Sequence, residues 1–193
     1  MKSLLALVCA AVLAGCGGKC PPPYYDGAGS DEAWRTMQDG EAHARADDAN
    51  AVHLFFPTEA VVISATGTPP TFNWTTPLTA SRETLPRGDA IASRESSWSS
   101  SVGGWIYGSA WAHLPPITGP THFLRITVPR QTCPLEVLTT RTEWTPNEAA
   151  WAALKTFTTG TLTFDVFSAY LQENRITEGP YHFTRPLSFT VAK

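Results

Sequence analysis

The 193-residue chain lacks an apolar run long enough to cross a bilayer. Its longest uncharged apolar run, residues 4–14, has about half of the roughly 20 residues that a membrane-spanning helix needs. Lys2 precedes this run, and Gly15 and Cys16 follow it, which is the layout of a secretory signal. The sequence therefore predicts an export signal at residues 1–15 rather than a transmembrane anchor.

Charged residues are also few, at 16% of the chain, and neither sign strongly predominates. Loss of residues 1–15 would remove Lys2 and no acidic residue, so the net charge would change from −3 to −4. A mildly acidic protein has no electrostatic attraction to polyanions. We therefore expect neither nucleic acid nor an anionic membrane surface as a partner.

The motifs of common enzyme classes are missing. The sequence contains no Gly-x-Ser-x-Gly elbow, no His-Glu-x-x-His pair and no glycine-rich phosphate loop. The histidines are scattered singly, and His122 falls on the apolar side of a predicted strand, where a core histidine is expected rather than a ligand. We predict no catalytic residues, no metal site and no cofactor, and hence a protein that is not an enzyme.

Four cysteines are present, and the first two belong to the N-terminal segment. Leu13-Ala14-Gly15-Cys16 resembles the bacterial lipobox, in which the signal is cut just before the cysteine. The resemblance implies that Cys16 becomes residue one and carries a diacylglyceryl thioether, usually with an acylated amine such as a palmitoyl amide. Each buried methylene contributes about 0.8 kcal/mol, so two or three chains would anchor the protein lastingly. The alternative is an ordinary signal peptide with a chance cysteine.

The residue after Cys16 indicates in which membrane such an anchor would hold the protein. Gly17 occupies the position at which an Asp favours retention in the inner membrane of enterobacteria, so we expect the outer membrane.

Removal of Cys9 with the signal and lipidation of Cys16 would leave Cys20 and Cys133. In an oxidising envelope these two could pair and stabilise the fold by about 4–5 kcal/mol in the chain-entropy model. Alternatively, Cys20 lies in a loose tether and Cys133 is an isolated thiol.

The chain beyond the signal divides by composition. Residues 16–29 are rich in Gly and Pro and indicate a semi-rigid tether. Residues 30–50 follow as a short helical or loop segment, in which Ser30 is a candidate N-cap, Trp34 and Met37 share one face, and Gly40 weakens the helix. Residues 51–193 form the predicted main domain.

Within the main domain, apolar residues recur with a period of two, which is typical of strands. The candidate strands are His53–Phe56 and residues 60–64, 71–75, 122–128, 135–144, 162–170 and 187–191. In residues 122–128, alternation directs His122 and Leu124 inward and Phe123 outward. Thr145, Pro146 and Glu148 predict the start of a short helix that buries Trp151 and Leu154 and ends near Lys155. The pattern predicts an all-β fold, an antiparallel sandwich with one or two short helices.

The order of these strands resembles a fibronectin type III-like (Ig-like) sandwich. The resemblance is carried by Phe72 and Trp74 on an early strand, by the alternating aromatic and aliphatic residues of 162–169, and by the closing Ser188-Phe189-Thr190-Val191. It covers roughly residues 60–193 and implies two packed antiparallel sheets. Two departures are the insertion at residues 79–120 and the helix before Thr161.

The insertion interleaves aromatic residues with Ser and Gly. If residues 105–113 are extended, Trp105, Tyr107 and Trp111 share one face and small aliphatic residues share the other. With the aliphatic face on the core, these rings and Trp98 would form an exposed platform suited to stacking on sugar rings or peptide anchors. With the aromatic face on the core, there is no platform.

The leading functional hypothesis is a membrane-anchored envelope lipoprotein with a binding, adhesion or structural role. Its partners would be the membrane, through the lipid, and an envelope protein or polysaccharide. A glycan-binding module that uses Trp98, Trp105, Tyr107 and Trp111 is the alternative. A hydrolase is a further one, and it requires a cleft in which the fold joins a histidine to a carboxylate or a Ser nucleophile.

Overall fold

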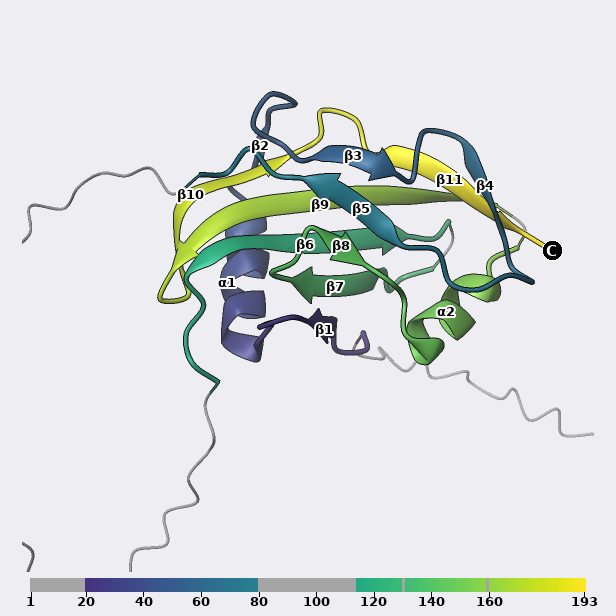
Figure 1. The fold of residues 1–193 in the computed structure, drawn as a ribbon, viewed down its shortest axis with the longest axis horizontal. Coiled ribbons are helices and arrows are strands. Elements are labelled where there is room, and N and C mark those ends of the chain that lie inside the picture. Colours follow the sequence, from purple (N-terminus) through teal and green to yellow (C-terminus); the bar gives the residue numbers. More distant parts are fainter. Residues whose placement is uncertain (1–19, 80–113, 130, 159) are drawn as a thin grey trace, which may run out of the picture.

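The computed structural model describes residues 20–79, 114–129, 131–158 and 160–193, which form a mostly β-structured domain with two short helices (Figure 1). The predicted all-β class is confirmed at this level. The elements in chain order are β1 (Tyr24–Asp26), α1 (Asp31–Glu41), β2 (Arg45–Ala46), β3 (His53–Phe56), β4 (Val61–Ser64), β5 (Phe72–Thr75), β6 (Gly119–Thr127), β7 (Leu135–Thr139), β8 (Glu143–Trp144), α2 (Glu148–Lys155), β9 (Thr161–Gln172), β10 (Arg175–His182) and β11 (Leu187–Ala192).

A long eight-stranded sheet forms the body of the domain. Six strands follow the order β1-β7-β6-β9-β10-β2, while β11 pairs with β9 and β4 pairs with β11. The 12-residue β9 lies at the centre, because one of its edges pairs with β6 along most of its length. Its other edge is shared: β11 pairs with its first part and β10 with its last part.

Three strand pairs of this sheet are parallel, namely β1 with β7, β2 with β10 and β4 with β11. The prediction of a purely antiparallel fold is therefore wrong at these pairs. In each of them, a short strand from the first third of the chain is added beside a later strand. Hydrophobic alternation reports which way side chains point and carries no information on strand direction, so the sequence pattern did not reveal these pairs.

A three-stranded antiparallel sheet, β3-β5-β8, lies across one face of the long sheet (Figure 1). Phe72 of β5 is fully buried at the centre of the interface, with its ring centroid 5.5 Å from that of Phe164 and 6.0 Å from that of Phe189. α2 closes one end of this core with Trp151 and Leu154, as predicted. Its N-cap is Asn147, two residues after Thr145, the cap that the sequence predicted.

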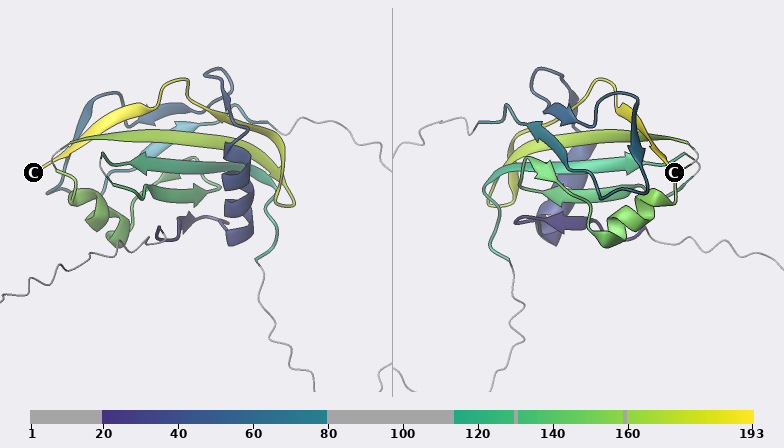
Figure 2. Two further views of the ribbon diagram at one scale, coloured as in Figure 1. Left: turned by 180° about the vertical axis from the view of Figure 1, so that it is seen from behind. Right: turned by 45° about the vertical axis from the view of Figure 1, so that its right-hand side comes forward.

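The opposite face of the long sheet is covered by α1, which stands in front when the domain is viewed from behind (Figure 2). Ser30 caps α1, as predicted, by accepting a hydrogen bond from the backbone N–H of Ala33. Met37 is buried against Phe123, Phe167 and Leu171. The helix runs through Gly40, where a Cβ atom would lie 2.5 Å from Cδ1 of Ile176, so this glycine allows α1 to approach β10 closely.

Coverage of both faces explains two further differences from the sequence prediction. Phe123, expected to point outward, does leave the main core, but it is buried under α1. The predicted strand over residues 135–144 is two strands, β7 and β8, which belong to different sheets. β10 was not predicted at all, because its apolar residues are few and Gly179 and Pro180 interrupt it.

Most of the predicted insertion, residues 80–113, lies outside the described residues, and its last two positions, Gly119 and Pro120, already belong to β6. Neither described helix is long and apolar enough to span a membrane.

Candidate functional site

The predicted site residues differ in what the structure says of them. Cys16 and the proposed aromatic platform lie outside the described residues; the platform consists of Trp98, Trp105, Tyr107 and Trp111. Cys20 and Cys133 are both described, and they form a disulfide with their Cα atoms 5.3 Å apart. The disulfide joins the start of the described chain to the loop between β6 and β7.

The segment that follows Cys20 is held on the domain. β1 pairs with β7 in parallel, with Tyr24 opposite Val137, and Pro23 is buried. The side-chain hydroxyl of Tyr25 donates to Asp31 at the start of α1 over 2.5 Å. Residues 20–29, predicted as part of a semi-rigid tether, are therefore attached to the domain, because a disulfide and a short strand fix them.

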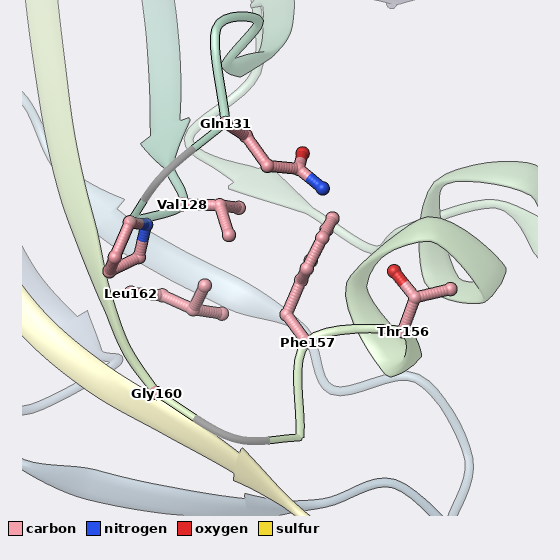
Figure 3. Close-up of a pocket in the computed structure, with 7 residues that line it drawn as sticks. Val128, Gln131, Thr156, Phe157, Gly160 and Leu162 are labelled. Carbon is pink, nitrogen blue, oxygen red and sulfur yellow. The ribbon is translucent and has the colours of Figure 1, made fainter. Parts of the chain in front are cut away.

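A groove lies at the end of the domain where the disulfide and α2 meet. It consists of two adjoining hollows of about 410 and 260 Å³, which share Val128, Gln131 and Phe157. The side chains of Val128, Leu162 and Phe157 line the larger hollow beside the C-terminal end of α2 (Figure 3). The smaller hollow is lined by Pro21, Pro22, Tyr24, Cys133, Pro134, Leu135, Glu136 and Ala153 in addition to the three shared residues.

The lining of the smaller hollow is mostly apolar. Its charged residue, Glu136, is engaged with Arg125, with 3.1 Å between Oε1 and the Arg125 Nη2. Phe157 reaches the groove because α2 ends at Lys155 and the chain turns there, with the Phe157 N–H donating to the Leu154 carbonyl over 3.1 Å. We define the two hollows together as the α2 groove; the chemistry of its smaller hollow fits an apolar ligand better than a charged one.

A second candidate is a polar pair inside the main core. His122 of β6 and Ser168 of β9 face each other across the sheet, with 2.8 Å between Nδ1 and Oγ, and both are fully buried. The Trp74 ring packs edge-on against the imidazole, 5.4 Å between centroids, and His122 Nε2 has no hydrogen-bond partner among the described residues. Burial lowers the pKa of His122 to about 3, so the imidazole is neutral at pH 7.

This pair is a structural element of the core. A nucleophilic serine must be reached by its substrate, whereas neither Ser168 nor His122 is exposed, and neither lines the α2 groove. The expectation of a core histidine at position 122 thus agrees with its burial.

A third candidate is a charged cluster on the face that carries α1. Arg125 of β6 binds Glu41 at the end of α1 through both guanidinium nitrogens, Nη1 and Nη2, and the second contact measures 2.7 Å. The guanidinium carbon also lies 5.1 Å from the ring centroid of Phe123 and 5.6 Å from that of Phe167. Arg125 therefore fastens α1 to the sheet through charge and through the aromatic rings beneath it.

Next to this cluster, His182 of β10 lies 3.5 Å from the carboxylate of Asp165 and stacks on Phe167. Burial raises the pKa of the Asp165 carboxyl, and the nearby His182 and hydrogen bonds from backbone N–H groups counteract that rise. A histidine oriented by a carboxylate can act as a general base. In the described part of the chain, however, no hydroxyl or thiol is hydrogen-bonded to His182, so no nucleophile is paired with it among these residues.

A further hollow, of about 550 Å³, lies beside β3 and the start of β11 and is lined by Leu54, Glu59, Phe183, Arg185, Pro186 and Leu187. The described residues hold no group of three or more His, Cys, Asp or Glu side chains arranged for a metal ion.

No protein-family model, curated protein or solved structure matches this chain. Of the two described concavities, the α2 groove is the one that lies beside the disulfide and next to the N-terminal segment. Sequence reasoning missed it, because its lining residues come from four separated segments and carry no local motif.

Proposed function

We propose that this chain is a bacterial envelope lipoprotein, anchored by lipid on Cys16, whose β-rich domain binds an envelope partner and does not catalyse a reaction. The disulfide between Cys20 and Cys133 carries this proposal. Disulfides persist in oxidising compartments such as the bacterial periplasm, and they are rare in the cytosol. A disulfide four positions after the lipobox cysteine supports an exported domain that begins directly behind its anchor.

The position of that disulfide also supports a short distance between domain and membrane. Three residues separate Cys16 from Cys20, so the two Cα atoms can be at most about 14 Å apart. The 14-residue tether of the sequence prediction is reduced to these residues, because the chain from Cys20 onward is packed on the sheet. A domain held so close to the bilayer suits a role at the membrane surface, and the outer membrane is the proposed location.

Intact-mass spectrometry of the protein from its native membrane fraction tests the anchor. We expect a species that begins at Cys16 and carries added diacylglyceryl and acyl mass, and we expect its loss in Cys16→Ala. Cys9→Ala is the matched control, because Cys9 lies in the predicted signal and should leave the mature mass unchanged. An uncleaved or unlipidated wild-type chain would overturn the proposal.

We also propose that the core of the domain is related to fibronectin type III-like sandwiches. The contacts of Phe72 with Phe164 and Phe189 support it, since they join two facing sheets. α1 and the three parallel edge strands would then be additions to that core. An experimental structure in which the two sheets cross at about 30° would support this relation, and a near-orthogonal crossing would contradict it.

Glycan binding is a second candidate, favoured by the alternation of Trp105, Tyr107 and Trp111 in the sequence. Stacking of a sugar ring on an indole changes its fluorescence. Addition of envelope polysaccharide should therefore shift the Trp emission of the wild type and leave that of a Trp105→Ala/Trp111→Ala variant less affected. An unchanged wild-type emission at saturating polysaccharide would contradict this candidate.

A further inference from the structure

The α2 groove begins where the chain arrives from its proposed lipid anchor. Cys133 lines the groove and is covalently bonded to Cys20, and Pro21 and Pro22 line it as well. The Cys16 Cα atom can lie at most about 14 Å from the Cα atom of Cys20, whose disulfide partner Cys133 is in the groove wall. Two of the three intervening residues are Gly17 and Gly18, which impose little stiffness on the link.

The smaller hollow of the groove offers an apolar chain a mostly apolar lining. The smaller hollow passes from Pro21, Pro22 and Tyr24 to Phe157, and the larger one continues from Phe157 to Val128 and Leu162. Figure 3 shows Phe157 between α2 and the end of β6, with Val128 and Leu162 facing it. The described lining of the smaller hollow is mostly aliphatic and aromatic, which suits a hydrocarbon, whose transfer out of water is favourable in proportion to its area. The larger hollow is more polar, because Gln131 and Thr156 also line it.

We infer that the α2 groove holds one acyl chain of the protein's own Cys16 lipid while the protein is outside a bilayer. The inference rests on the proposed lipidation of Cys16. A short flexible link gives the lipid an effective concentration in the millimolar range at the groove, so a modest intrinsic affinity is enough for occupancy. Within a bilayer the same chain is surrounded by other lipids and the groove has no advantage, so the protein can release it there.

Binding of an acyl chain in the groove would help a lipoprotein of the outer membrane, because its acyl chains must cross the aqueous space between two membranes. Burial of one chain reduces the apolar surface that is exposed to water during that passage. The remaining chain or chains would still need a carrier.

Photocrosslinking of the lipid tests the inference. Cells are supplied with a diazirine-bearing fatty acid, and the labelled lipoprotein is purified, freed of detergent and illuminated. We expect most crosslinked product to run as a monomer, with the label on peptides that contain Val128, Leu135 or Phe157. Label spread evenly over the domain, or product that runs mainly as a crosslinked dimer, would overturn the inference.

Adjacent alanines in α2 provide a matched pair of variants. Ala153 lines the groove, whereas Ala152 is exposed on the same helix and does not line it. Ala153→Trp should fill the groove and lower the groove crosslinks several-fold, while Ala152→Trp should leave them at the wild-type level. If Ala153→Trp fails to fold, Gln131→Trp with Thr132→Trp as its control repeats the comparison on the opposite wall.

The outcomes separate this inference from the function on which it rests. If the intact mass shows no lipid on Cys16, both proposals fail. If the lipid is present and the crosslinks do not change between Ala153→Trp and Ala152→Trp, the envelope lipoprotein stands and the groove inference is overturned.

Discussion

Alternate residues of β6 and β9 form the two faces of the long sheet, and the two faces are covered in different ways. Toward the small sheet, β6 and β9 contribute Leu124, Ile126, Phe164 and other apolar side chains, with His122 and Ser168 as a buried polar pair. Toward α1, the apolar cover extends only as far as the helix does, and Arg125 and Asp165 occupy the next positions. One face is therefore covered by the small sheet. The other face is covered by α1, which the ion pair of Arg125 attaches to the long sheet.

The comparison shows that a strand can serve two cores without a change in its alternating pattern. Phe123 and Leu124 are neighbours in the sequence and both are fully buried, on opposite faces. Four changes test how different the two faces are.

The largest effect is expected on the face that the small sheet covers. Phe72→Ala removes a fully buried ring that contacts Phe56, Trp144, Phe164 and Phe189, and it should lower the free energy of unfolding by about 3–5 kcal/mol. Phe55→Ala is the control, because Phe55 is 62% exposed and its loss should cost less than about 0.5 kcal/mol. Denaturant titration measures both, and equal losses would show that the small sheet does not seal the core.

The polar pair on the same face should make the protein sensitive to acid. The pKa of His122 is about 3 in the folded state and about 6.5 when unfolded, so the unfolded chain binds the proton first. The contribution of the neutral His122 to the free energy of unfolding is complete above pH 6.5. It is lost as the pH falls toward 3, by up to about 1.4 kcal/mol per pH unit.

Unfolding titrations between pH 6.5 and 4.5 measure this effect, because carboxylates titrate mainly below that window. His122→Gln should flatten the slope, whereas His53→Gln, which alters an exposed histidine of β3, should keep it. A wild-type slope that persists in His122→Gln would assign the acid sensitivity to another group.

On the face that carries α1, the ion pair between Arg125 and Glu41 should contribute less to the free energy of unfolding than the buried groups of the other face do. A double-mutant cycle of Arg125→Met and Glu41→Gln is expected to give a coupling of about 1 kcal/mol, because both side chains are about one quarter exposed. The coupling should decrease in 0.5 M salt. A coupling near zero would leave Met37 and its apolar neighbours as the attachment of α1.

The smallest effect concerns the close approach of α1 to β10. Gly40→Ala should improve the helix by up to about 1 kcal/mol and lose a similar amount to the clash with Ile176, so little net change is expected. In the Ile176→Val background, which lacks the clashing Cδ1, the same Gly40→Ala should stabilise the protein. Failure of the double variant to gain stability would place the constraint at Pro180, whose Cγ would be 3.2 Å from the new Cβ.

These elements also show what the sequence could predict. Strong alternation located β3, β5, β6, β9 and β11, and local capping residues located both helices, because these signals are local in the chain. The pairing of Cys20 with Cys133 stayed open, since spacing alone does not bring two cysteines together. Strand β4 was located too, at residues 60–64, but its parallel pairing was not. That pairing, the strands β1 and β2, the second core under α1 and the α2 groove depend on contacts between distant segments, and no short-range pattern encodes them.

The disulfide has one more consequence, for how the protein survives cleavage. Cys20 and Cys133 enclose every peptide bond between them, and residues 80–113 lie inside that loop. A protease that cuts the chain once within the loop leaves two fragments that are still covalently joined. If the cut lies between β5 and β6, the strands of the two fragments also stay paired in the same sheets. β3, β4 and β5 come from one fragment, and β6 to β11 come from the other. A nicked molecule should therefore migrate as one species on a non-reducing gel and separate into two only after reduction.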